Sequence, residues 1–186
     1  GVAVFGKRIA MIPARKTPKG RGAPVSSRLQ AGLWAEYFDG LGAYPTIKDM
    51  PLIERAELKL DFGATAPPQR KEQGMKGWPL GGACAGIFSG YIKLPKDGVY
   101  TFFIASDDGT VLYIDGEESI DNGGIHKFAE LWGQVELSAG YHRVWIKYFN
   151  ASGSMGLVLS YKPKNDRAVP VPADMLFHDP DEVRAR

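Results

Sequence analysis

From residue 87 onward, short runs of apolar, β-branched and aromatic residues alternate with turn-forming residues. Most of the turns contain glycine next to aspartate, asparagine or serine, which is typical of strands joined by tight connections. Strands at this spacing predict an all-β, antiparallel sandwich or barrel. The predicted strands span residues 87–94, 99–105, 111–115, 134–137, 143–149 and 157–161.

Two of these runs differ in the make-up of their faces. Residues 99–105 are apolar at nearly every position, which predicts a central strand covered on both faces. In residues 143–149, Val144, Ile146 and Tyr148 share one face, whereas the other face mixes charged and aromatic side chains. We therefore predict one core face and one amphipathic face for this strand.

The first part of the chain is less regular. Residues 33–38 are predicted to form a strand, and residues 39–80 are irregular and contain five prolines. Within that stretch only Leu52–Leu60 is compatible with a short helix. Residues 1–30 have several prolines and glycines and no apolar periodicity, so we expect an extended arm there.

Length and composition fit one globular domain with added ends. Of the 186 residues, 44% are hydrophobic, and no run of eighteen apolar residues offers a membrane span. The single cysteine, Cys84, excludes an internal disulfide and is expected to be a small buried residue. The chain begins at Gly1 and not at methionine, which we interpret as a processed N-terminus, and no basic-then-apolar segment of a secretory signal is visible.

The net charge of +2 is unevenly distributed. Residues 1–30 carry seven basic and no acidic residues, which leaves 16 of the 23 basic residues against 21 acidic ones in the rest. An acidic body argues against a nucleic-acid-binding face on the domain itself. The basic arm is either a solvated tail or a docking segment for an acidic partner, and the first is favoured because such charge runs are usually solvated.

The sharpest chemical feature is the pair Asp107 and Asp108, which comes directly after an apolar run and is followed by Gly109. One interpretation is an ordinary Asp-Gly turn. The other is a calcium site, since calcium takes six to eight oxygen ligands and paired carboxylates supply its charge. Successive side chains of an extended strand point to opposite faces. A cis peptide bond between the two residues would let both carboxylates reach one ion.

A second loop that could supply oxygens follows the strand ending at Phe149. Asn150 offers a side-chain carbonyl, and Gly153 and Gly156 free the backbone of this loop to present main-chain oxygens. Turns rich in Asn, Ser and Gly are common, so this loop gains weight only together with the aspartate pair.

Several motifs, in order along residues 31–178, resemble the PA-fourteen domain, the module named after protective antigen. The most specific stretch runs from Gly98 to Gly116. The matching residues are Gly32-Leu33, Glu36-Tyr37-Phe38, Phe88–Ile92, Gly98–Phe102, Ser106–Gly109, Leu112–Gly116, Leu137, Gly140–His142, Tyr148-Phe149, Leu157 and Val171–Ala173 with Leu176.

This resemblance implies a jelly-roll-like β-sandwich spanning residues 31–178, after the basic arm of residues 1–30 and before a C-terminal tail of residues 179–186. It also implies a non-catalytic module that binds glycans. In the sugar-binding adhesins of the family, paired aspartates joined by a cis peptide hold a calcium ion that contacts sugar hydroxyls. Asp107 and Asp108 match that pair, and Asn150 matches an asparagine ligand after a Tyr-x-Asn step. Main-chain oxygens near Ser152 and Ser154 would complete the shell.

Other residues are weighed as further contacts for a ligand. His126 either lines a binding cleft or is a plain loop residue, and Trp78 and Trp132 lie in expected loops where an indole could meet a sugar or a partner. Asp107 and Asp108 are adjacent, which argues against a glycosidase pair, whose carboxyl groups stand ~5–9 Å apart. We therefore predict a binding protein and not an enzyme.

Two functional hypotheses remain open. The first is a calcium-dependent carbohydrate-binding module of a secreted or cell-surface protein. The second is a structural subunit of a larger, intracellular or organellar assembly, with the arm and the C-terminal stretch lying on partner proteins, because an arm without its own fold is ordered when something holds it.

Overall fold

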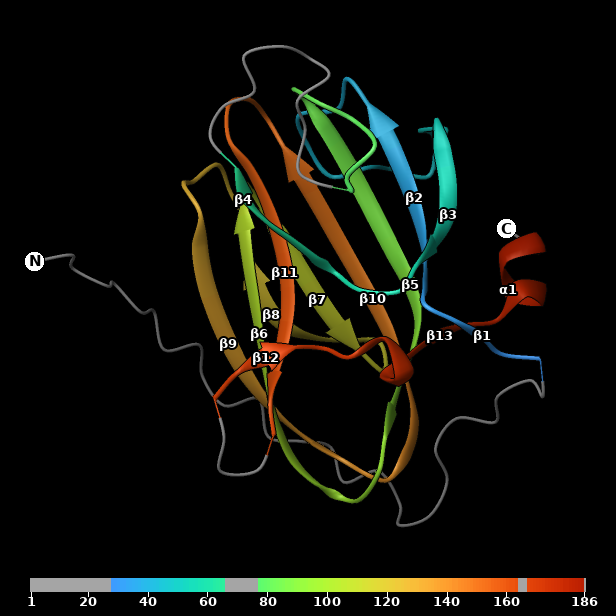
Figure 1. Ribbon diagram of the computed structural model, residues 1–186. Helices are drawn as coiled ribbons and strands as arrows, with labels where there is room; N and C mark the ends of the chain where they lie inside the picture. Colours follow the sequence, from blue (N-terminus) through green and yellow to red (C-terminus); the bar gives the residue numbers. More distant parts are fainter. Residues whose placement is uncertain (1–27, 66–76, 164–166, 186) are drawn as a thin grey trace, which may run out of the picture.

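The computed structural model describes residues 28–65, 77–163 and 167–185. Within these residues the strands form two antiparallel sheets, one of eight strands and one of five, which stack as the layers of a sandwich (Figure 1). The predicted antiparallel β-sandwich is thus confirmed. Most of the basic arm, residues 1–27, lies outside the described residues.

The larger sheet is built on two long strands that pair along their whole lengths, from Gly140 opposite Leu94 to Asn150 opposite Cys84. Its strands are β1 (Gln30–Ala31), β2 (Leu33–Asp39), β3 (Ile53–Glu57), β5 (Cys84–Leu94), β7 (Thr110–Ile114), β8 (Glu117–Asn122), β10 (Gly140–Asn150) and β13 (Leu176–His178). They follow the order β1-β13-β5-β10-β7-β8, and β2 joins through β5 and carries β3.

The smaller sheet contains β4 (Asp61–Thr65), β6 (Gly98–Asp107), β9 (Ala129–Leu137), β11 (Met155–Lys162) and β12 (Val169–Pro170). Its order is β12-β11-β6-β9, with β4 also on β11. A 3-10 turn, η1 (Ala173–Met175), precedes β13, and a short helix, α1 (Pro180–Arg184), follows it. Among the described residues, no helix is long and apolar enough to cross a membrane.

The core lies between the inward faces of the two sheets. In β10, Val144, Ile146 and Tyr148 are buried, as the alternation of that strand predicts. From the smaller sheet, Leu157 and Leu159 of β11 are equally buried. Cys84 is fully buried at the start of β5, which confirms the predicted buried residue, and burial raises the pKa of its thiol to about 12.

Two expectations about single elements are corrected. The helix considered within Leu52–Leu60 is wrong, because Ile53–Glu57 forms β3 and pairs with β2 from Leu33 opposite Glu57 onward. Hydrogen bonding to a free strand edge outweighs the local helical pattern there. The strand at residues 99–105 is central, between β11 and β9, but Val99 is 63% exposed, so its outer face is only partly covered.

Two of the connections between the sheets lie at the same end of the sandwich. The chain leaves β6 of the smaller sheet for β7 of the larger one through Asp108 and Gly109, and it leaves β10 for β11 through residues 151–154. The register places Asp107 opposite Gly156 of β11, and Tyr148 of β10 opposite Thr110. The two loops that the sequence singles out therefore meet.

Candidate metal site

The two aspartates lie where β6 ends. Asp107 is the last residue of this strand and Asp108 begins the crossing to β7, and the peptide bond between them is cis. Their exposed fractions are 8% and 3%. Gly109 follows because a Cβ there would overlap the ring of Phe149 and lie 3.0 Å from the carbonyl oxygen of Gly124. The Asp-Asp-Gly step thus fits a crowded crossing point.

Asp108 holds the two neighbouring loops together. Its Oδ1 accepts a hydrogen bond from the main-chain N–H of His126 (2.9 Å), and its Oδ2 accepts one from the main-chain N–H of Ala151 (2.8 Å). Asp107 is fixed through its carbonyl oxygen, which accepts from the buried Tyr148 hydroxyl (2.7 Å). This bond gives a structural reason for the Tyr-x-Asn step, because Tyr148 supports the aspartate pair two residues before Asn150.

Asn150 is the third predicted ligand. It is fully buried at the end of β10, and its Nδ2 donates to the carbonyl oxygen of Gly82 (2.8 Å). Its Oδ1 is buried without a hydrogen-bond partner. A buried acceptor left unpaired is unfavourable by about 1–3 kcal/mol. A cation beside the aspartates would satisfy it.

The electrostatics of the pair also favour a cation. Burial and the neighbouring Asp108 carboxylate raise the pKa of Asp107, although His126 and a hydrogen bond from the Phe128 backbone oppose the rise. A positive ion held by both carboxylates would remove their repulsion. The side-chain donors at this position are carboxylate and amide oxygens, which calcium accepts.

Within the described part of the chain, no group of three or more His, Cys, Asp or Glu side chains is arranged so that it could hold a metal ion. The oxygens of Asn150 and of the main chain are not part of that count, and calcium shells use both. Main-chain oxygens near Ser152 and Ser154 stay a prediction. The residues present at the crossing fit a calcium ion by the chemistry of their donors and by the unpaired Asn150 oxygen.

Of the other two predicted ligand contacts, His126 and Trp132, the structure brings only one near the aspartates. His126 lies beside the aspartates, but its ring nitrogens lie 2.8 Å from the Lys127 carbonyl oxygen and 2.9 Å from that of Asn122. Its ring thus braces its own loop. Trp132 is not in a loop: it lies in β9 opposite Phe103, four residues along β6 from Asp107, or about 13 Å. The structure therefore does not bring Trp132 to the aspartates.

The expectation that the Trp78 indole could meet a sugar or a partner is also wrong. Trp78 lies in a connection, as expected, but it is 5% exposed, and its ring packs edge-on against Tyr37 (centroids 4.8 Å apart) and Tyr148 (4.9 Å). Gly82 and Ala151 were not predicted, and they contact Asn150 and Asp108 through main-chain atoms. A main-chain donor or acceptor leaves no trace in residue type, so no sequence signal marks these two positions.

The sequence of residues 81–174 matches the family model of the PA14 domain. Because this match spans half of the chain, the protein belongs to the PA14 domain family, which confirms the resemblance inferred from its motifs. No curated protein sequence matches the chain.

Solved structures share the fold at low sequence identity. An anti-sigma factor domain-containing protein is 20% identical with a TM-score of 0.66; the match covers 80% of this chain and 48% of that one, so this chain spans about half of that protein. The PA14 sugar-binding domain of an RTX adhesin is 17% identical, with a TM-score of 0.67 and coverage of 80% and 99%. The epithelial adhesin 6 A domain of Candida glabrata, in complex with Galβ1-3GlcNAc, is 15% identical, with a TM-score of 0.63 and coverage of 84% and 90%.

Proposed function

We propose that this chain is a non-catalytic, calcium-dependent carbohydrate-binding module. The observation that carries the proposal is the unpaired, buried Oδ1 of Asn150 at the crossing that also holds Asp107 and Asp108. The adhesin structures support it, because one is described as sugar-binding and the other holds Galβ1-3GlcNAc. An extracellular or cell-surface location accords with this role.

The proposed role of each residue follows from its contacts. Asp107, Asp108 and Asn150 would hold the ion, and the ion would supply a positive charge that binds neighbouring sugar hydroxyls. Asp108 also anchors the loops of His126 and Ala151, so the walls around the ion are fixed before a ligand arrives. Such preorganisation reduces the entropy lost on binding. The alternative of a structural subunit rests on the arm, most of which lies outside the described residues.

Calcium titration by calorimetry tests the metal step. We expect the wild-type chain to bind one calcium ion and the double variant Asp107→Asn with Asp108→Asn to lose this binding. Asp107→Asn alone, which leaves the loop-anchoring Asp108 intact, is a milder second variant. Asp174→Asn removes one negative charge, as Asp107→Asn does, but from an exposed position in η1. It should bind calcium like the wild type. Absence of calcium binding by the folded wild type would overturn the mechanism.

Glycan binding is then measured with calcium and with EDTA. The proposal expects binding that calcium supports and EDTA abolishes. Binding at the aspartates that is equal in both conditions would contradict calcium dependence, and conversion of the glycan to products would contradict a non-catalytic role.

A further inference from the structure

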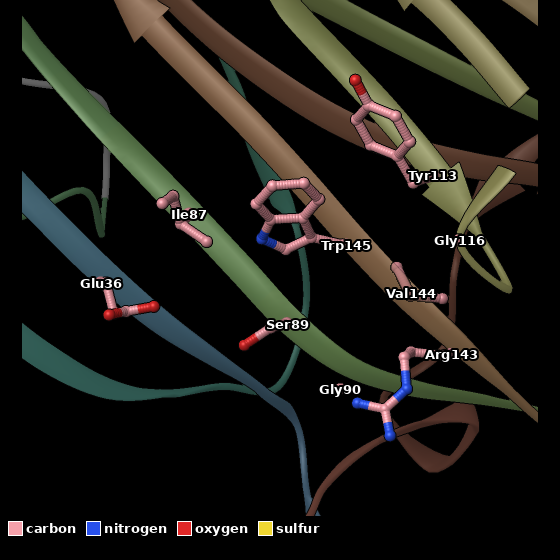
Figure 2. Close-up of a pocket in the computed structure, with 9 residues that line it drawn as sticks. All are labelled: Glu36, Ile87, Ser89, Gly90, Tyr113, Gly116, Arg143, Val144 and Trp145. Carbon is pink, nitrogen blue, oxygen red and sulfur yellow. The ribbon is translucent and has the colours of Figure 1, made fainter. Parts of the chain in front are cut away.

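The outer face of the larger sheet carries a hollow of about 500 Å³ that lies away from the aspartates. Figure 2 shows Ser89 of β5 and Trp145 of β10 side by side on this face, with Tyr113 beyond them and Glu36 and Arg143 at the edges. Ser89 is five residues along β5 from Cys84, the partner of Asn150, which corresponds to about 16 Å. The hollow is therefore separate from the candidate metal site.

The strand register explains why the face is hollow. Ser89 is paired with Trp34 of β2 on one side and with Trp145 of β10 on the other. The indole of Trp34 turns away, toward the ring of His178 (centroids 5.6 Å apart). A small residue next to Trp145 therefore leaves an open floor beside an aromatic wall.

The floor carries an unused hydrogen-bonding group. Ser89 is 5% exposed, and its hydroxyl oxygen has no hydrogen-bond partner. A serine placed among aromatic and aliphatic neighbours without a partner is unfavourable unless a ligand supplies one. Ser89 lines the hollow, so rotation of its side chain would bring the covered hydroxyl to a polar group of a ligand that occupies it.

The wall of the hollow is an aromatic platform. Trp145 is 36% exposed, and its ring lies 5.3 Å from that of Tyr113 at 40°. The ammonium group of Lys147 lies 4.4 Å from the indole centroid, which helps to hold the ring in place. Faces of aromatic rings carry partial negative charge, so they attract the polarised C–H groups of a ligand lying flat on them.

We propose that this hollow is a second, calcium-independent binding site for a neutral sugar ring. The apolar C–H face of the ring would stack on Trp145, and a ring hydroxyl would bond to Ser89. The volume is in the range of small-molecule sites, which combine apolar walls with a few polar groups. This inference does not use Asp107, Asp108 or Asn150.

Two other kinds of ligand fit less well. An extended peptide cannot add a strand here, because β5 and β10 are paired on both sides. An anion would face the carboxylate of Glu36, while the guanidinium of Arg143 is already bound to both carboxylate oxygens of Glu182 (2.9 and 2.8 Å). A neutral, hydroxyl-rich ring matches both the platform and the serine.

The test is a titration of the full chain with cellohexaose, maltohexaose and lactose in EDTA, followed by tryptophan fluorescence and by backbone amide NMR. We expect at least one sugar to shift the amides of residues 87–90 and 143–146. Trp145→Ala should weaken this binding at least about tenfold, and Ser89→Ala, which removes only the hydroxyl, a few-fold. Trp132→Ala is the matched control, because Trp132 is also exposed but lies on the smaller sheet, and it should bind like the wild type.

The outcomes separate this site from the metal site. Binding in EDTA that survives Asp107→Asn with Asp108→Asn, and that Trp145→Ala and Ser89→Ala reduce, supports the proposal. Failure of all three sugars to bind in EDTA overturns it, whether or not calcium-dependent binding is found. Equal losses in Trp145→Ala and Trp132→Ala would also overturn it, because the aromatic platform would then have no special role.

Discussion

At the scale of single residues, His142 shows how a buried ionisable group is held. It is 2% exposed, its Nδ1 lies 2.7 Å from a carboxylate oxygen of Asp115, and its Nε2 lies 2.9 Å from the Ser138 carbonyl oxygen. Burial alone would lower its pKa, but the hydrogen bonds to Asp115 and Ser138 and the charge of Asp115 outweigh burial and raise it. The folded protein therefore favours the imidazolium form of His142 more than the unfolded chain does.

This arrangement predicts a pH-dependent stability. Because the folded-state pKa of His142 lies above the unfolded value of ~6.5, its contribution is fully present below that pH and is lost as pH rises through the folded value. We expect the free energy of unfolding, measured with urea over a series of pH values, to decrease through this window.

The variant Asp115→Asn tests whether the pair of Asp115 and His142 causes this pH dependence. Asp115 has a positive φ of 51°, which asparagine tolerates, and the Asn Oδ1 keeps the acceptor for the Arg143 N–H. The charge beside His142 is lost together with the acceptor for its Nδ1, because the Asn Nδ2 takes the place of the Asp115 Oδ2. We expect a loss of about 1 kcal/mol at low pH, since Asp115 is partly exposed, and a flatter dependence on pH. An unchanged pH profile would show that the pair does not produce the effect.

At the scale of elements, Gly90 allows β13 to close against β5. It lies within β5, and a Cβ at this position would overlap the carbonyl oxygen of Phe177 and approach a methyl group of Leu33 at 3.0 Å. Gly90→Ala is therefore expected to lower the free energy of unfolding by about 1–3 kcal/mol through overpacking. Gly98→Ala, at the start of β6 with open space around it, is the control and should change stability far less. Chemical denaturation of both variants measures the difference.

The elements also show what could be predicted from sequence. β6, β7 and β10 were predictable because their apolar runs are followed by Asp-Gly or Ser-Gly turns, and the core face of β10 follows from alternation. β3 was not, because its pairing with β2 is a long-range contact that overrides a locally ambiguous run. The aspartates and Asn150 stand out as oxygen donors beside turns. The contact of Gly82 with Asn150 and the hollow beside Ser89 depend on the strand register. Residue types alone therefore could not predict them.

At the scale of the whole molecule, the candidate metal site bridges the two sheets. Asp107 ends β6 of the smaller sheet, whereas Asn150 ends β10 of the larger one. The bond from the Ala151 N–H to Asp108 already links the two crossings. An ion bound by all three side chains would add a further link, and it would do so only in the folded chain, because unfolding separates residues that are more than forty positions apart in the sequence.

Calcium should therefore raise the thermal stability of the chain. A ligand that binds only the folded state, present at a hundred times its dissociation constant, stabilises it by about 2.7 kcal/mol. For a domain of this size that corresponds to a rise in Tm of roughly 5–10 °C. Calorimetric scans with calcium and with EDTA measure the shift. Asp107→Asn with Asp108→Asn should show none, and Asp174→Asn should match the wild type; an equal rise in the double variant would place the stabilising calcium ion elsewhere on the molecule.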